Sequence, residues 1–242
     1  MTVKNKFILE VCAYNIQSCI IAQNAGAARI ELCSGPLEGG TTSSYGTMQQ
    51  VREKISIQLY PIIRPRGGNF IYDDNEVAIM KKDILFCKVI GCEGISTGAQ
   101  LANGKIDTEL LKRMADWAYP MGVTCHRVFD MVPDPFEALE DIIDCGCERI
   151  LTSGLKSTAV EGADLLKQLV EKAEGRITIM PGGGVRSSNI RELITRTGAT
   201  EYHTSAITTK SKKSTSDTDI LNIGEIVIAD EEELKSILSV AL

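Results

Sequence analysis

The feature that most constrains this chain is a four-fold internal repeat, in which a helical pattern is followed by a glycine and a short apolar strand. Each strand ends in small polar residues. The four copies begin at Gly26, Gly91, Gly146 and Gly198. They lie roughly 50 to 65 positions apart, enough for two strand–helix units each. A glycine suits the end of each helix, because the residue after a helix is often left-handed.

Four further apolar segments alternate with the repeats and are predicted strands: Phe7–Cys12, Ile57–Ile63, Gly122–Arg127 and Arg176–Met180. Helical patterns fill the gaps at 15–25, 43–54, 73–90, 108–118, 136–145, 159–173, 188–195 and 230–241. Strict alternation predicts parallel strands joined by right-handed crossovers. A four-fold repeat of a strand pair favours a closed barrel over an open sheet.

We therefore predict an α/β protein with one (β/α)₈ TIM-barrel domain over residues 1–242, close to the ~250 residues typical of that fold. The polar stretch 207–225 is predicted to be a long loop, either mobile or a lid, and 230–241 the C-terminal helix.

Composition excludes several classes of protein. The formal net charge is −6 and the longest basic cluster is only Lys210, Lys212 and Lys213, so nucleic acid is not an expected partner. No apolar run approaches the ~20 residues that span a bilayer, and residues 1–9 lack the features of a secretory signal. We expect a cytoplasmic protein without membrane contact. Its eight cysteines should then be free thiols that pack as small apolar side chains or bind a soft metal.

In a TIM barrel, the chemistry lies at the C-terminal ends of the strands. Both histidines of the chain fall at such ends, which favours a functional site there. The polar and cysteine residues at these ends are Glu10, Cys12, Glu31, Cys33, Arg64, Arg66, His126, Arg127, Asp130, His203 and Ser205.

Two of these cysteines form a candidate metal site. Strand residues i and i+2 share a face, so Cys12 points the same way as Glu10, and Cys33 the same way as Glu31. Adjacent strands lie ~4.8 Å apart, so equivalent positions on the first two strands would bring both sulfurs within reach of one ion. Two thiolates suit Cu(I), whereas structural zinc takes four ligands. The alternative is that both cysteines only fill the core.

The charged residues also allow two interpretations. A small anionic substrate would be bound by arginines with a nearby aspartate: Arg64, Arg66, Arg127 and Asp130. Acid–base chemistry would then come from Glu10, Glu31 or His126. The alternative is a buried ion network in which arginines hold the inward glutamates ionised, because charges inside a barrel are costly unless paired.

A glycine triplet, Gly182, Gly183 and Gly184, follows the seventh predicted strand. Many barrels bind phosphate at this place, and glycines let backbone N–H groups converge on an anion. The same triplet is compatible with a tight turn that binds nothing.

A series of motifs in a fixed order resembles the CutC copper homeostasis family. The segments are 10–12, 29–35, 38–42, 64–68, 126–130, 149–154 and 180–186, and the resemblance runs from about Phe7 to about Ala206. It implies a (β/α)₈ barrel, a role in copper homeostasis, Cu(I) bound by Cys12 and Cys33, and assembly as a homo-oligomer.

Three functions remain open on these grounds. The first is a cytosolic copper-binding protein with paired cysteines at the barrel mouth. The second is an enzyme that acts on a small phosphorylated or carboxylated metabolite by glutamate and histidine acid–base chemistry. The third is a partner-binding barrel with an inert mouth.

Overall fold

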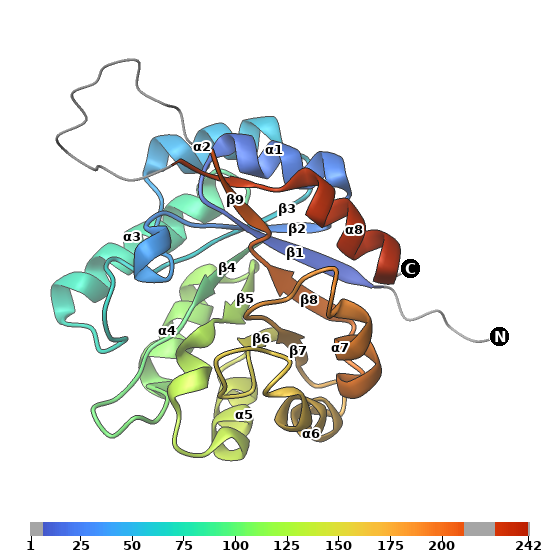
Figure 1. Ribbon diagram of the computed structural model, residues 1–242. Helices are drawn as coiled ribbons and strands as arrows, with labels where there is room; N and C mark the ends of the chain where they lie inside the picture. Colours follow the sequence, from blue (N-terminus) through green and yellow to red (C-terminus); the bar gives the residue numbers. More distant parts are fainter. Residues whose placement is uncertain (1–6, 211–225, 242) are drawn as a thin grey trace, which may run out of the picture.

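Eight short parallel strands form a ring at the centre of the molecule, and helices cover its outside (Figure 1). The computed structural model describes residues 7–210 and 226–241. The ring consists of β1 (Ile8–Ala13), β2 (Arg29–Leu32), β3 (Gln58–Pro61), β4 (Gly94–Thr97), β5 (Gly122–Cys125), β6 (Arg149–Thr152), β7 (Thr178–Pro181) and β8 (Glu201–Thr204). These are the four repeat strands alternating with the four intervening strands, as predicted.

The strands pair in the orders β3-β2-β1-β8 and β4-β5-β6-β7. β3 and β4 are joined by a parallel bridge between Ile62 and Ser96, and the Ile63 amide donates to the Ser96 carbonyl at 2.7 Å. β7 and β8 lie side by side at the other junction. The ring is therefore closed, and the barrel prediction is confirmed.

The outer layer consists of α1 (Ile16–Ala25), α2 (Tyr45–Lys54), α3 (Asp74–Val89), α4 (Thr108–Ala118), α5 (Pro135–Asp144), α6 (Ala163–Ala173), α7 (Ile190–Thr197) and α8 (Glu231–Ala241), with 3₁₀ turns η1 (Pro36–Glu38) and η2 (Arg127–Met131). Local sequence explains where several helices begin. The Asn15 side chain caps α1, and Asp73 forms a reciprocal capping box with Glu76 at α3.

The repeat glycines have the predicted left-handed backbone, with φ of 105°, 78°, 82° and 68° at Gly26, Gly91, Gly146 and Gly198. Gly26 also closes α1, because its amide donates to the carbonyl of Ala22. The glycine pattern therefore marks helix ends that lead directly into strands.

The predicted loop over 207–225 is wrong at its first four residues. Ile207–Lys210 forms β9, which pairs antiparallel with β10 (Ile226–Ala229). The segment begins with β-branched residues, which favour extended backbone. β10 is also tied to α1, since Asn15 donates to the Val227 carbonyl at 2.8 Å and the Ala229 amide donates to Ser18 at 3.1 Å. The rest of this prediction, residues 211–225 with the lysines at 212 and 213, lies outside the described residues.

None of the described helices is both long enough and apolar enough to cross a membrane.

One acidic side chain on α3 is buried at a cost. Burial raises the pKa of Asp83 to about 6 from its ordinary value of 3.8. Because the folded-state pKa is the higher one, this group favours the folded state at low pH and disfavours it as the pH rises through about 6. At ~1.4 kcal/mol for each pH unit, the rise from 3.8 to about 6 sets an upper bound on the free energy of unfolding that is lost at neutral pH. Partial solvation reduces this loss to ~1–2 kcal/mol.

We therefore expect the difference in melting temperature between Asp83→Asn and the parent to be more in favour of the variant at pH 7.5 than at pH 4.5. Thermal unfolding of both proteins at the two pH values measures this change. The pH-independent cost of a buried amide cancels in the comparison. A melting difference that is equal at the two pH values would contradict the assignment.

Candidate functional site

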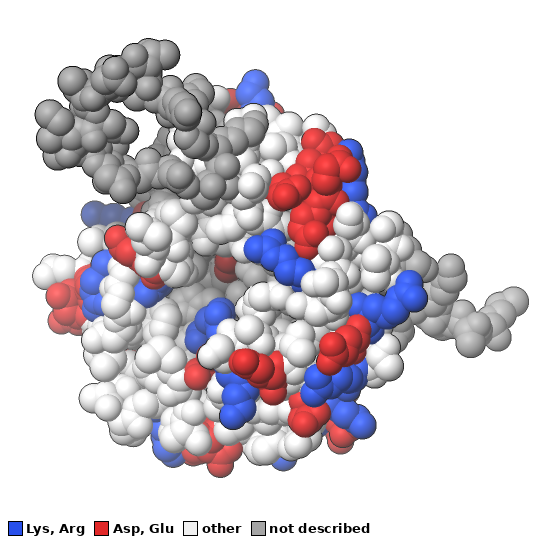
Figure 2. All heavy atoms as spheres, viewed as in Figure 1, with Lys and Arg blue, Asp and Glu red and all other residues white. Residues whose placement is uncertain are grey.

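A cavity of about 220 Å³ opens at the C-terminal ends of the strands. Figure 2 shows a hollow near the centre of this face, with basic side chains on several sides of it. Its lining includes Cys12, Glu31, Arg64, Phe70, His126, Arg127, Gly183, Gly184, Arg186, His203 and Ser205. The volume is below the ~300–1,000 Å³ of pockets for drug-sized ligands, so the cavity suits an ion or a small metabolite.

The two predicted cysteines meet beside this cavity, and of the pair it is Cys12 that lines it. The Sγ atoms of Cys12 and Cys33 are 3.6 Å apart, and Cys33 Sγ lies 3.5 Å from Glu31 Oε2. The thiols and this carboxylate offer three buried donor atoms within 4.8 Å of one another. A metal–thiolate bond is ~2.3 Å long. Since the sulfur separation is less than twice that length, a single ion can contact both.

The strand register that produces this pair differs from the one expected. Cys12 lies opposite Glu31 and Glu10 lies opposite Arg29, so the strands are offset by two positions from the predicted pairing of equivalent residues. Strands in a barrel are tilted and staggered. Because the offset is even, every side chain keeps its face, and Cys33 still reaches Cys12 as its diagonal neighbour.

The two thiols are not equivalent in acidity. The hydrogen bond between the two thiols lowers the pKa of Cys12 well below its ordinary value, against the opposing effect of burial. The same hydrogen bond, followed by burial, raises the pKa of Cys33 well above its ordinary value. Cys12 is therefore the thiol that ionises first, beside the imidazole of His203.

The surroundings of His203 favour its protonated form. Burial opposes its protonation, but hydrogen bonds with Cys12 and Glu10 outweigh burial and raise the pKa of His203 well above its ordinary value. The carboxylate of Glu10 accepts from His203 Nδ1 at 2.7 Å.

Glu10 lies beneath the cavity and is not among the residues that line it. One carboxylate oxygen binds His203 and the other binds Arg29. Burial would raise the pKa of Glu10, but the charge of Arg29 and the hydrogen bond to His203 outweigh it and lower the pKa to about 2. The side chain predicted as catalytic is thus engaged on both oxygens and positions His203.

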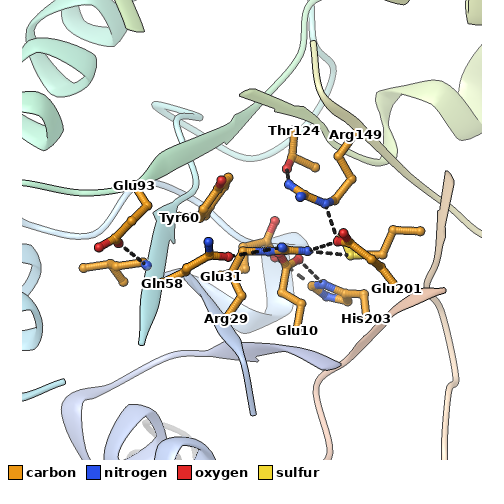
Figure 3. A network of polar contacts seen from close by, with 12 residues as sticks. Glu10, Arg29, Glu31, Gln58, Tyr60, Glu93, Thr124, Arg149, Glu201 and His203 are labelled. Atoms are coloured by element: carbon orange, nitrogen blue, oxygen red, sulfur yellow. Dashed lines mark hydrogen bonds and ion pairs between the residues drawn. The ribbon is translucent and has the colours of Figure 1, made fainter. Parts of the chain in front are cut away.

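Below this layer, the chain contains a buried ion network of the kind that the sequence allowed as an alternative, but built from other arginines and without Glu31 (Figure 3). Arg29 bridges Glu10 and Glu201, with a distance of 2.5 Å to Glu201. Arg149 binds the same Glu201 oxygen at 2.6 Å and Glu148 at 2.8 Å. Acidic and basic groups alternate, so each buried charge faces an opposite one.

Glu31 differs from Glu10, because its Oε1 atom is buried without a partner among the described residues. Burial raises the pKa of Glu31 to about 8, the negative charges of Cys12 and Glu10 add to this effect, and His203 opposes it.

His126 lies on another side of the cavity, directly after β5. Its Nδ1 accepts a hydrogen bond from the Val128 amide at 3.2 Å, so the ring proton is on Nε2 in the neutral form. Burial lowers the pKa of His126 to about 3, and the charge of Arg64 adds to this. The centroid of its ring lies 4.8 Å from the centroid of the Phe70 ring.

The three predicted anion-binding arginines have different environments. The guanidinium of Arg64 donates to the backbone carbonyls of Glu38, Gly40 and Gly68 at 2.6 to 2.8 Å. Arg66 pairs with Glu76 at 2.5 Å and does not line the cavity, so the structure does not bring it to the predicted site. Arg127 lines the cavity while binding Asp130 at 2.7 Å.

Asp130 organises a loop and is not among the cavity-lining residues. It accepts hydrogen bonds from Thr152, Ser153 and Leu155 as well as from Arg127. These hydrogen bonds fix the loop after β6 next to Arg127.

The glycine triplet is only partly at the surface of the cavity. Gly183 and Gly184 line it, with φ of 98° and 74° that favour glycine. Gly182 packs behind them, and a Cβ atom there would lie 2.4 Å from the Leu151 side chain. Sequence reasoning assigned no role to Arg29, Arg149, Glu201 or His203, although each is a charged or polar residue within a predicted strand segment.

Comparison with known proteins agrees with the motifs. Residues 7–208 match the CutC family. The chain is 48% identical over 202 residues to the mouse copper homeostasis protein cutC homolog, covering 84% of this chain and 74% of that protein. It is 47% identical over 206 residues to the human cutC homolog, covering 85% and 76%.

Solved structures give the same result for the fold. The crystal structure of the putative copper homeostasis protein CutC from Streptococcus agalactiae superimposes with a TM-score of 0.78 at 33% identity, covering 82% of this chain and 98% of that one. Phosphoribosyl anthranilate isomerase from Thermotoga maritima superimposes with a TM-score of 0.60 at 11% identity, covering 97% and 98%. At that identity the likeness concerns the barrel fold alone.

Proposed function

This chain belongs to the CutC family, and from that premise we propose that it binds Cu(I) between Cys12 and Cys33 at the mouth of the barrel. The observation that carries the proposal is the 3.6 Å separation of two buried, reduced sulfurs beside a cavity. Thiolates are the ligands that favour Cu(I). Copper is here the cargo of the protein.

The surroundings of the pair support this proposal. Thiols must lose their protons to bind a metal, and the pKa of Cys12 is already lowered by its hydrogen bond with Cys33. The third nearby donor, Glu31, has an unpartnered oxygen. A carboxylate is a hard ligand that a soft ion does not prefer, so we expect Glu31 to contribute less to copper affinity than either thiol.

An anaerobic titration of the reduced protein with Cu(I), in competition with a chromophoric chelator, tests the proposal. We expect one Cu(I) per chain to be withdrawn from the chelator. Failure to compete for the first equivalent, or continuous uptake of several ions without a break, would overturn it.

We propose as a second candidate an enzyme that acts on a small anionic metabolite by acid–base chemistry. The specific observation that favours it is that Glu31 and His126 line the same cavity, each with a buried polar atom that lacks a partner among the described residues. Copper binding by two thiols does not require His126.

This second function is tested by incubating the metal-free protein with mixed phosphorylated and carboxylated metabolites in D₂O. The expected result is deuterium incorporation into one compound, detected by mass spectrometry, which Glu31→Gln abolishes. Incorporation that persists in Glu31→Gln, or that no compound shows, would exclude the proposed proton transfer.

A further inference from the structure

Buried polar atoms without partners gather around this cavity. Three of those found in the described residues belong to side chains that line it: Glu31 Oε1, Arg64 Nε and His126 Nε2. Leaving a buried donor or acceptor unpaired costs ~1–3 kcal/mol. Such groups are normally completed by protein, by ordered water or by a ligand.

The two donors of this set are held in place before anything binds. Three backbone carbonyls fix the Nη atoms of Arg64, which leaves its Nε–H group. The Val128 amide fixes the His126 ring with its Nε2–H group unpaired. Both side chains pack against Phe70, each at 4.8 Å from that ring. Such preorganised donors lose little entropy when they bind an acceptor.

A second set of donors lies on the β7 side of the cavity. Within the described residues, the backbone N–H groups of Gly183 and Gly184 have no protein acceptor. Asp130 and Ser153 hold Nε and Nη2 of Arg127. A Cβ atom on Gly183 would lie 3.6 Å from Arg127 Nη1, so the guanidinium and the glycine backbone border the same space. Adjacent glycine amides and an arginine are a common arrangement for an oxyanion.

We infer that this cavity binds a small organic anion, with its phosphate or carboxylate group at Arg127, Gly183 and Gly184 and a second oxygen accepting from His126 and Arg64. The inference deepens the second proposed function, because it names the class of molecule and the residues that hold it. It requires binding only and does not require turnover. The donors on these walls are N–H groups, so the bound molecule must present acceptor oxygens.

The test uses isothermal titration calorimetry on the full, reduced, metal-free chain. The probes are phosphoglycolate, which carries a phosphate and a carboxylate, malonate, which carries two carboxylates, and inorganic phosphate, which carries one oxyanion group. We expect one saturable site per chain that binds a two-headed probe more tightly than inorganic phosphate. Preference for phosphoglycolate over malonate would show that one of the two bound groups is a phosphate, and the reverse preference would show that both are carboxylates.

Three variants identify the residues. His126→Phe removes the Nε2 donor and should weaken the preferred probe ~10-fold or more, because the ligand oxygen then stays unpaired. Arg127→Gln alters a half-exposed side chain and should weaken it to a similar degree. Arg176→Gln removes a matched arginine that pairs with Glu140 elsewhere on the surface and should change nothing.

The inference is overturned if no probe binds saturably, or if both His126→Phe and Arg127→Gln bind like the parent. If His126→Phe does not fold, Arg127→Gln decides alone. The outcomes are separable from the other proposals. Binding without deuterium incorporation would remove the enzyme and leave this inference, whereas normal Cu(I) uptake without anion binding would remove this inference and leave the copper proposal.

Discussion

Replacing Arg29 with methionine is expected to lower the free energy of unfolding by ~3–5 kcal/mol, because the loss of one partner leaves buried charges uncompensated. Arg29 is 1% exposed and bridges Glu10 and Glu201. Without it, Glu10 keeps His203 and Glu201 keeps Arg149, but the two buried carboxylates lose the cation that they share. For a chain of this size, the loss corresponds to roughly 6–20 °C in melting temperature.

Two further variants show whether charge is the cause. Arg176→Met removes an exposed arginine that makes a two-pronged pair with Glu140 at 2.6 and 2.9 Å, and such exposed pairs contribute ~0–1 kcal/mol. The double variant Arg29→Met/Glu201→Gln removes one charge of each sign and should recover part of the stability lost in Arg29→Met. Equal losses for Arg29→Met and Arg176→Met, or no recovery in the double variant, would contradict the network described here.

The second large effect concerns copper. In Cys12→Ser/Cys33→Ser, the affinity for the first Cu(I) should fall by at least ~100-fold, about 2.7 kcal/mol, because two hydroxyls replace the only soft ligands of the buried group. Each single variant should lose most of this affinity, since one thiolate cannot hold the ion alone. Glu31→Gln should lose less than either. Competition titration against the same chelator measures all four proteins.

A matched control exists within the chain. Cys145→Ser/Cys147→Ser also removes two buried thiols, but these lie between the end of α5 and the start of β6, at the N-terminal end of that strand, and neither of them lines the cavity. Its first-site affinity should equal that of the parent. A similar drop in both double variants would indicate unspecific uptake by thiols and would refute a defined site.

The fold could be predicted from the sequence because each repeat has a strong local pattern. A glycine such as Gly26 ends a helix and is followed at once by a short apolar strand, and both features depend only on neighbouring residues. The error at 207–210 has the opposite origin. β9 exists through its partner β10, some twenty positions later, and composition gave no sign of that pairing.

The site could be predicted from the sequence only in part. Residue parity predicted that Cys12 and Cys33 share the faces of Glu10 and Glu31, and the structure brings the two sulfurs together. Parity could not predict which arginines turn toward the cavity. Arg64 and Arg66 are two positions apart and so have the same parity, but Arg64 binds backbone carbonyls and Arg66 binds Glu76. Arg29 carried a readable signal, a charge two positions before Glu31 on the same buried face, which indicates a deeper ionic layer.

The central claim is that Cys12 and Cys33 hold one Cu(I) together. X-ray absorption spectroscopy on the chain loaded with one equivalent of Cu(I) tests it most directly, with Cys12→Ser/Cys33→Ser prepared identically. The predicted result is a copper shell with two sulfur neighbours that is lost in the double variant. A shell made only of nitrogen and oxygen, or sulfur neighbours that persist in the double variant, would contradict the claim.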